Sequence, residues 1–274
     1  MPRNRKEYYE YISTDNKPVV TLQQYQEMPA TAFLAAIVGA KKAAEMCIIK
    51  FKANRANYTQ PAKQALQIVN SSLLAYIMGQ YETYQKYLFA QMFEYSVYLT
   101  SFDVELFIKN LSKEANINIE IVRFAGYRDK PHSVGLVLAE NLKNWQSPDK
   151  VNKYFAAFGL QNINHQQQQF LTNDDVNDLK VLWQMRHSIV HTANTITLPD
   201  SQKIDMLNDF GNKSIILEER FIPEIVRKFH PLIKGSTDRM ESIYSPNIDN
   251  GVNQEIIDKI RDLFKVESSC NSWL

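Results

Sequence analysis

Apolar residues recur every three to four positions along most of the chain, which is the spacing of one face of an α-helix. The longest pattern of this kind runs from Ala62 to about Leu99, and its length suits the central helix of a bundle. Its apolar positions are Leu66, Val69, Leu73, Ile77, Tyr81, Tyr84, Leu88, Met92, Tyr95 and Leu99. The sequence therefore predicts an all-α fold, a multi-helix bundle organised around this segment.

The segment before the central helix divides into an irregular and a helical part. Residues 1–30 are polar and irregular, with breaks at Pro18 and Pro29. Ala30 to Lys52 has the pattern of one amphipathic helix, which the stretch from Ala53 to Pro61 ends.

Further helices are expected after the central one. They cover Phe102 to Ala115, Val134 to Trp145, Asp149 to Phe158, Asp174 to about His191, Glu218 to about Ile233, and Gln254 to Val266. Pro148 suits the first position of the third of these helices. Asn118 to Tyr127 fits either a short strand or an extended connector, and Thr237 to Asn253 is typical of a loop.

These patterns divide the chain into three stretches. Residues 1–61 form an N-terminal extension with one helix, residues 62–235 a helical domain, and residues 236–274 a C-terminal loop and helix. A chain of 274 residues has the length of one or two domains.

Composition narrows the classes of partner. With 31 Lys and Arg against 30 Asp and Glu, the chain has no overall field that draws it to nucleic acid, so such binding has to be local. The presence of only 8 glycines argues against a turn-rich β architecture and against glycine loops that hold phosphates.

The longest uncharged apolar run, Ala30 to Ala40, is shorter than the roughly 20 residues that span a bilayer, and the basic start of the chain lacks a signal-peptide pattern. Cys47 and Cys270 are too few for a disulfide framework, so we expect a cytoplasmic protein that does not bind membranes.

The candidate chemistry lies in the segment from Arg186 to His191, which places an arginine and two histidines within six residues. Thr172 and Asp175 have the spacing of a capping box, which predicts that the helix carrying this segment begins there. Arg186 falls in the middle of the apolar stripe of that helix, which consists of Val176, Leu179, Leu182, Trp183 and Val190. A buried, unpaired guanidinium is costly, by about 3–5 kcal/mol where one partner of a buried pair is removed. The stripe therefore predicts an anion, a partner chain or a cleft at Arg186, or an ion pair with Glu82 or Glu94.

The residues Arg186-His187-Ser188-Ile189-Val190-His191 resemble the signature of HEPN domains: an arginine, a polar residue, three further residues and a histidine. The lead-in 173–185, the segment 76–88 with its central Glu82, and the segment 145–160 are similar to the corresponding parts of that family, and the similarity covers residues 62–235. HEPN domains of the RiboL-PSP-HEPN type share this pattern. His187 is a departure, since the family most often has asparagine there, and it leaves the division of work between His187 and His191 open.

The resemblance implies an all-α protein with a HEPN-like core and an endoribonuclease that needs no metal or other cofactor. It implies three catalytic residues: Arg186 grips the phosphate, His191 transfers the proton, and His187 orients the nucleophile or shares the transfer. Glu82 is a supporting candidate behind them. Arg186 and His191 point about 140° apart on one helix, and HEPN nucleases form homodimers with a composite cleft. The expected products carry a 2′,3′-cyclic phosphate and a 5′-hydroxyl. A toxin or antiphage role, with a regulatory or antitoxin protein as partner, fits this activity.

Other readings remain open from the sequence. His187 and His191 have the spacing of two zinc ligands, but Ser188 stands where a metalloprotease has its glutamate and no third ligand is evident. A HEPN-like dimer without cleavage activity could bind RNA, nucleotide or protein, and a helical scaffold would have no role with nucleic acid. The remaining candidates are expected to be ordinary surface or core groups: His132, His165 and His230, the tyrosines of the central helix, and the basic residues Arg3, Arg5, Lys6, Lys50, Lys52 and Arg55.

Overall fold

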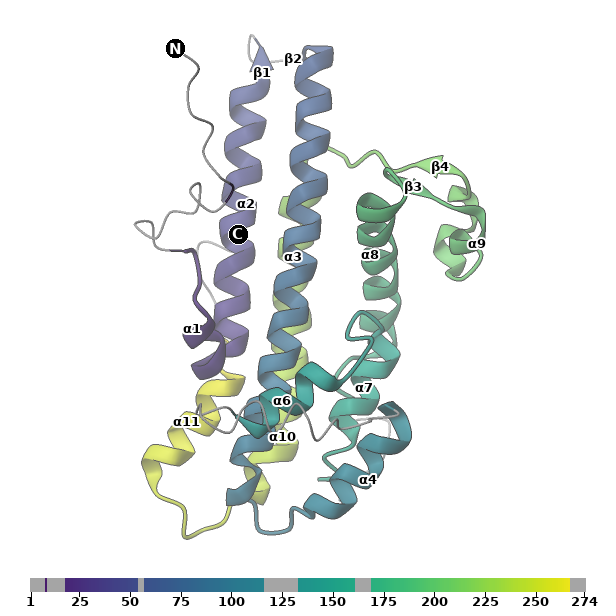
Figure 1. The fold of residues 1–274 in the computed structure, drawn as a ribbon. Coiled ribbons are helices and arrows are strands. Elements are labelled where there is room, and N and C mark those ends of the chain that lie inside the picture. The colour runs from purple at the N-terminus through teal and green to yellow at the C-terminus, as the bar shows by residue number, and fades with distance from the viewer. Residues whose placement is uncertain (1–7, 9–17, 54–56, 116–132, 161–168, 267–274) are drawn as a thin grey trace.

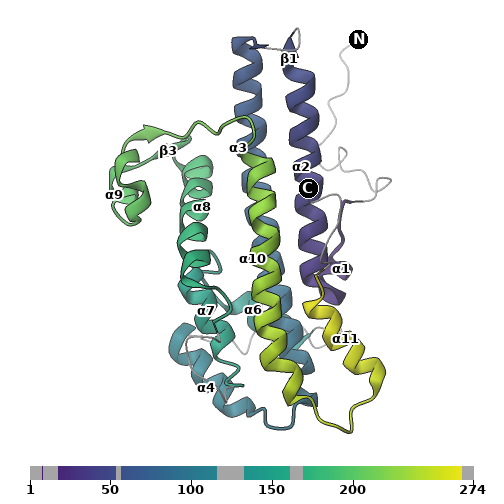
Figure 2. The same cartoon turned by 180° about the vertical axis from the view of Figure 1, so that it is seen from behind.

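The computed structural model describes residue 8 and residues 18–53, 57–115, 133–160 and 169–266. Its largest helices are α2 (Pro29–Phe51), α3 (Gln60–Tyr95), α8 (Asn173–His191) and α10 (Phe221–Tyr244). In Figure 1, α2 and α3 run side by side, and in Figure 2 α10 lies over α3, between α2 and α8. The chain is thus a helical bundle, as its apolar periodicity predicted.

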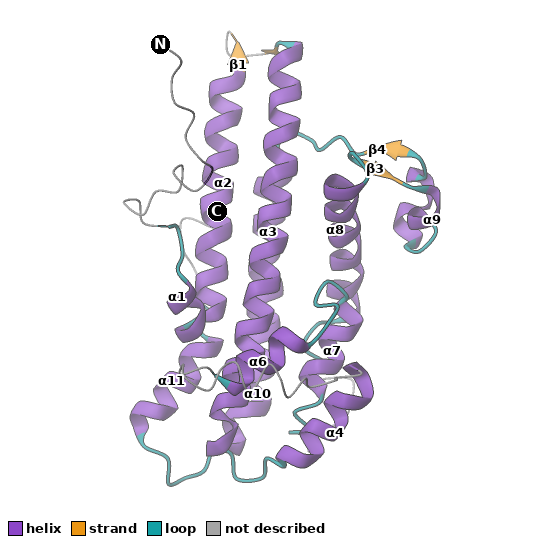
Figure 3. Ribbon diagram, viewed as in Figure 1, coloured by secondary structure: helices purple, strands orange, loops and turns teal. Residues whose placement is uncertain are grey.

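Shorter helices cover the end of the bundle where α3 ends (Figure 1). They are α1 (Leu22–Glu27), α4 (Val104–Ala115), α6 (Val134–Asn141), α7 (Pro148–Ala156) and α11 (Gln254–Phe264). The 3-10 turns are η2 (Ser96–Tyr98), η3 (Asp205–Phe210) and η4 (Ser245–Asn247), and the short helix α9 spans Leu198–Ser201. Two antiparallel strand pairs, each two residues long, join β1 (Lys52–Ala53) to β2 (Asn57–Tyr58) and β3 (Thr195–Ile196) to β4 (Lys213–Ser214). Figure 3 shows how small the strand content is beside the helices.

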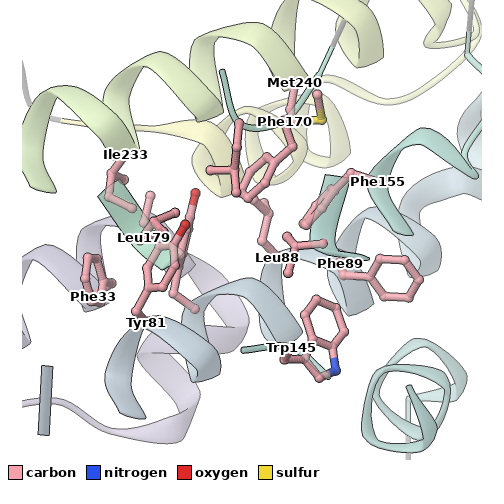
Figure 4. Packing of buried hydrophobic residues seen from close by; sticks show 14 of the residues in the cluster. Phe33, Tyr81, Leu88, Phe89, Trp145, Phe155, Phe170, Leu179, Ile233 and Met240 are labelled. Carbon is pink, nitrogen blue, oxygen red and sulfur yellow. The ribbon is translucent and has the colours of Figure 1, made fainter. Parts of the chain in front are cut away.

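One apolar core joins the large helices. Phe33 of α2, Tyr81 of α3, Leu179 of α8 and Ile233 of α10 meet in it, as Figure 4 shows. The rings of Phe33 and Tyr81 have centroids 5.5 Å apart, and each fully buried aromatic ring removes a large apolar area from water. Core residues come from each of the three stretches into which the sequence divides, from Tyr25 to Phe264.

The periodicity predicted most helices to within a few residues. The helices expected over 30–52, 62–99, 102–115, 149–158, 174–191 and 254–266 are confirmed as α2, α3, α4, α7, α8 and α11. The helix expected over 134–145 ends early, at Asn141, because the chain turns at Asn144 (φ 67°) and the indole of Trp145 donates back to the Ala139 carbonyl. The alternative of a strand or a connector over 118–127 lies outside the described residues.

Three expectations about irregular segments were wrong. Residues 22–27 form α1, because Thr21 and Gln24 build a capping box. Pro29 opens α2 at its first position, where the missing N–H costs nothing, rather than acting as a break. The helix expected to end near Ile233 continues through the predicted loop as far as Tyr244.

Two features explain this longer helix. Proline cannot donate the helical hydrogen bond, yet α10 carries Pro231 in its interior, where the ring is exposed. Beyond it, the buried Thr237 donates its hydroxyl to the Ile233 carbonyl, so a polar side chain is satisfied inside the helix rather than ending it.

Candidate functional site

The helix that carries the predicted site begins at a capping box. Thr172 accepts a hydrogen bond from the Asp175 N–H at 3.1 Å, and the Asp175 carboxylate accepts one from the Thr172 N–H at 2.9 Å. Arg239 of α10 donates to the same carboxylate at 3.2 Å, which ties the start of α8 to α10. The capping box predicted from the sequence is therefore confirmed.

The apolar stripe of α8 is buried along most of the helix and exposed near its end. Val176, Leu179 and Trp183 are buried in the core of the same chain, so this part of the stripe is not available to a partner chain. Val190, the second-last residue of the helix, is 48 % exposed. The change from buried to exposed occurs at Arg186, which is half-buried.

The motif histidines lie together on the exposed side of the last turns of α8. The ring centroids of His187 and His191 are 4.9 Å apart with their planes at 45°, and both side chains are exposed. A spacing of four residues places side chains one above the other on a helix, so this pairing follows directly from the sequence. Two imidazoles at this distance can act on one bound molecule.

Arg186 has unused hydrogen-bonding capacity. Its Nε atom is buried, and no described residue accepts a hydrogen bond from it. The indole Nε1 of Trp183, three residues earlier on the same side of the helix, is also buried without a described acceptor. Buried N–H donors normally have an acceptor. The two donors on Arg186 and Trp183 therefore indicate an acceptor that is not among the described residues of the chain.

The ion pair considered as an alternative for Arg186 does not form with the residues named for it. Glu82 binds the ammonium of Lys86 at 2.6 Å and accepts a hydrogen bond from Gln146. Glu94 accepts from the Ser133 hydroxyl and from the Gly135 N–H. The structure therefore does not bring Glu82 to the motif residues as a supporting group.

A small projection follows the motif helix and was missed in the sequence. The segment 195–214, named here the hairpin, contains β3, α9, η3 and β4 and extends from the end of α8 beside its last turn (Figure 1). It is anchored where α8 ends, because the Ser188 carbonyl accepts from the N–H groups of Thr192 and Asn194 at 3.1 and 3.0 Å. Asn194 (φ 63°) supplies the left-handed turn there.

After the hairpin, the chain is fixed to α3. The side chain of Gln67 donates to the Leu217 carbonyl at 2.5 Å and accepts from the Leu217 N–H at 2.7 Å. The side chain of Asn70 donates to the Glu218 carbonyl at 3.1 Å. These bonds fix the end of the hairpin that follows β4, and the Ser188 carbonyl fixes the end that precedes β3.

The hairpin brings the carboxylate of Asp200 close enough to His187 for the two charges to interact. Its carboxylate accepts hydrogen bonds from the Lys203 ammonium at 2.7 Å and from the Thr197 hydroxyl at 2.8 Å, and these bonds lower its pKa. The charges of Lys203 and, to a smaller extent, of His187 lower the pKa further. The signal in the sequence was the spacing of Thr197 and Asp200, which is that of a helix cap.

The remaining histidines, the tyrosines of the central helix and Lys52 were further candidates for binding groups. His230 lies inside α10 and is half-buried, whereas His132 and His165 lie outside the described residues. Tyr81 and Tyr84 are fully buried core residues. Lys52, one of the basic residues expected to be ordinary surface groups, pairs with Glu219 at 2.7 Å. Among the described residues, no group of three or more His, Cys, Asp or Glu side chains lies together in a way that could hold a metal ion.

The chain was compared with models of protein families, with curated proteins and with solved structures, and none of them matches. None of the described helices has both the length and the apolar composition needed to cross a bilayer.

Proposed function

We propose that this protein is a cytoplasmic endoribonuclease with a HEPN-like core, and that Arg186, His187 and His191 are its catalytic residues. The observation that carries the proposal is the exposed imidazole pair, 4.9 Å apart, next to a guanidinium whose Nε has no described acceptor. Cleavage of RNA through its 2′-hydroxyl requires a base, an acid and a cation for the phosphoryl oxygens. The three motif residues supply these chemical types without a metal ion.

The chemistry follows from the residue types. His191 accepts the proton of the ribose 2′-hydroxyl while its oxygen attacks phosphorus, and the bond to the 5′-oxygen breaks. The departing oxygen takes a proton from the second imidazole, so the products are a 2′,3′-cyclic phosphate and a 5′-hydroxyl. Arg186 holds the charged phosphoryl oxygens with two parallel N–H donors, which the single ammonium of a lysine does not reproduce.

The direction of the side chains favours a site shared by two chains. On a regular helix, positions 186 and 191 face about 140° apart, so one chain does not aim Arg186 and His191 at the same phosphate. In a twofold dimer, each cleft takes the arginine from one chain and the histidines from the other. Around the helix, Val190 lies between Arg186 and His191, and its exposed side chain is available to such an interface.

A nuclease of this kind is toxic to its own cell unless it is restrained. We therefore include in the proposal a role as a toxin or antiphage effector, regulated by a partner protein such as an antitoxin.

The test is cleavage of total cellular RNA by the purified protein in EDTA. We expect cleavage by the wild type and a loss of at least 100-fold in Arg186→Ala and His191→Ala, since each removes a group that acts in the transition state. Asn177→Ala, an exposed position on the same helix, is the matched control and should cleave like the wild type. Intact RNA with a folded wild-type protein, or equal cleavage by all variants, contradicts the proposal.

A further inference from the structure

A groove of about 640 Å³ separates α8 from α10, on a different part of α8 from the histidine pair. Its walls are mainly apolar and include Leu179, Leu182, Met185, Phe221 and Ile225. Pockets of about 300–1,000 Å³ with apolar walls and a few polar groups are typical of small-molecule sites. The groove thus has the size and lining of a ligand site.

The two ends of the groove differ. Because α8 and α10 are antiparallel, the ion pair of Asp175 and Arg239 stands at the end near the start of α8. Met206 of the hairpin and Phe221, the first residue of α10, line the opposite end. From Asp175 to Met185 the helix rises about 15 Å, so the groove suits a narrow molecule of about that length.

Arg239 at the first end can bind an additional acceptor. Its Nε donates to the Gln169 carbonyl and its Nη2 donates to the Phe170 carbonyl and to Asp175, but no described residue accepts a hydrogen bond from Nη1. Gly235 stands beside that nitrogen, where an added Cβ would lie 3.1 Å away. The side chain of Arg239 is only 25 % exposed, so a free donor on it is less well hydrated than one at the surface.

The other charged groups of the lining are satisfied or exposed. Glu224 pairs with Arg227 at 2.9 Å. Asp178 and Lys228 are exposed and carry opposite charges, so together they do not favour either sign of ligand. Asp175 offsets the charge of Arg239, so the polar end is set by the remaining Nη1 donor rather than by net charge. A carboxylate oxygen of a ligand makes the strongest hydrogen bond with such a donor.

We propose that the groove binds a single-chain amphipathic molecule, with its apolar body along Leu182, Met185 and Ile225 and its anionic head group at Arg239. This site is independent of the proposed nuclease activity and is tested by binding alone. Met185 of the lining is the neighbour of Arg186 in the sequence, so a ligand here contacts the helix that carries the motif.

The test is calorimetric titration of the full chain with dodecanoate, beside dodecanol as a probe with the same apolar chain and no charge. We expect one dodecanoate per chain and at least tenfold weaker binding of dodecanol. Leu182→Trp, which fills the groove, and Arg239→Gln, which removes the head-group donor, should each weaken dodecanoate binding at least tenfold. Ile216→Trp, at a side chain that is 76 % exposed and outside the groove, is the matched control and should bind like the wild type.

Circular dichroism and thermal melting establish that each variant is folded. If Arg239→Gln does not fold, the comparison of dodecanoate with dodecanol still tests the head group. The proposal is overturned if dodecanoate and dodecanol bind equally, or if Leu182→Trp and Ile216→Trp bind dodecanoate equally. It is also overturned if the wild-type chain does not bind dodecanoate. A dimer that Leu182→Trp separates, with no dodecanoate bound, would instead show that a second copy occupies the groove.

Discussion

The imidazole rings of His187 and His191 lie 4.9 Å apart, centroid to centroid, at the exposed end of the same helix that buries Trp183 in the core. The core anchors one end of α8, and the hairpin and the linker at Leu217 hold the chain at its other end. The histidines are therefore exposed to solvent while the backbone beneath them is fixed. General acid–base catalysis needs this combination of access and position.

The proposed composite site predicts complementation between two inactive variants. When Arg186→Ala and His191→Ala chains are mixed and allowed to exchange, half of the dimers contain one chain of each kind, and each of these has one intact cleft. We expect recovery of about one quarter of the wild-type cleavage rate. The rate of RNA cleavage before and after mixing is the measurement. No recovery, under conditions where exchange of labelled chains is observed, would place the whole site in one chain.

Asp200 predicts a pH-dependent contribution of the hairpin to stability. Hydrogen bonds from Lys203 and Thr197 lower its pKa in the folded chain, so the stabilisation is complete above the ordinary aspartate value near 3.9 and is lost as the pH falls through the lowered pKa. Asp200→Asn should therefore reduce the free energy of unfolding by about 1 kcal/mol at pH 7 and by less at pH 3. Urea unfolding at both pH values measures this. Asp209→Asn, at an exposed position of the same hairpin, is the control, and an equal loss by Asp200→Asn at both pH values is the contradictory result.

Two helical glycines predict opposite effects of the same substitution. An added Cβ at Gly135 of α6 would lie 2.2 Å from the carbonyl oxygen of Ala90 on α3, whereas one at Gly79 would meet nothing within 4 Å. Gly135→Ala should lower the free energy of unfolding by about 2–3 kcal/mol, because α6 must move away from the backbone of α3. Gly79→Ala should raise it by up to about 1 kcal/mol through helix propensity. Denaturant unfolding of both variants checks the close packing of α6, and equal effects would contradict it.

Two buried tyrosines make a similar matched pair. The hydroxyl of Tyr81 is buried with the side chain of Gln85 beside it but makes no well-formed hydrogen bond among the described residues, whereas that of Tyr244 donates to the Met92 carbonyl at 2.6 Å. Tyr81→Phe should leave the free energy of unfolding unchanged or raise it by up to about 1 kcal/mol, because it removes an unsatisfied buried group. Tyr244→Phe should lower it by about 1–2 kcal/mol, because the Met92 carbonyl loses a donor. Thermal and urea unfolding distinguish the two, and a larger loss for Tyr81→Phe would show a partner outside the described residues.

The fold was predictable from sequence where local signals agree with the tertiary contacts. The long helix α3 and the start of α8 at Thr172 follow from apolar spacing and a capping box. The continuation of α10 past Pro231 does not follow, because burial of Ile233 and Met240 outweighs the local cost of the proline. The hairpin was missed because its elements are too short for periodicity to show.

The site was predictable to a similar extent. The two side chains His187 and His191 are adjacent because they are four residues apart on one helix. Glu82 and Lys86 are also four residues apart, and their ion pair explains why Glu82 does not pair with Arg186. Burial of the Arg186 Nε and the position of Asp200 depend on how α8 packs and on where the hairpin folds back. Such contacts between distant segments leave no pattern in a single sequence.

The chemistry of the cut ends tests the central claim most directly. RNA treated with the wild-type protein in EDTA is analysed for its termini, with Asn177→Ala as the active control and Arg186→Ala and His191→Ala as the inactive ones. The account predicts 2′,3′-cyclic phosphate and 5′-hydroxyl ends, and resistance of a substrate with a single 2′-deoxynucleotide at the cut position. Ends with a 3′-hydroxyl and a 5′-phosphate, or cleavage that requires an added divalent metal ion, would contradict it.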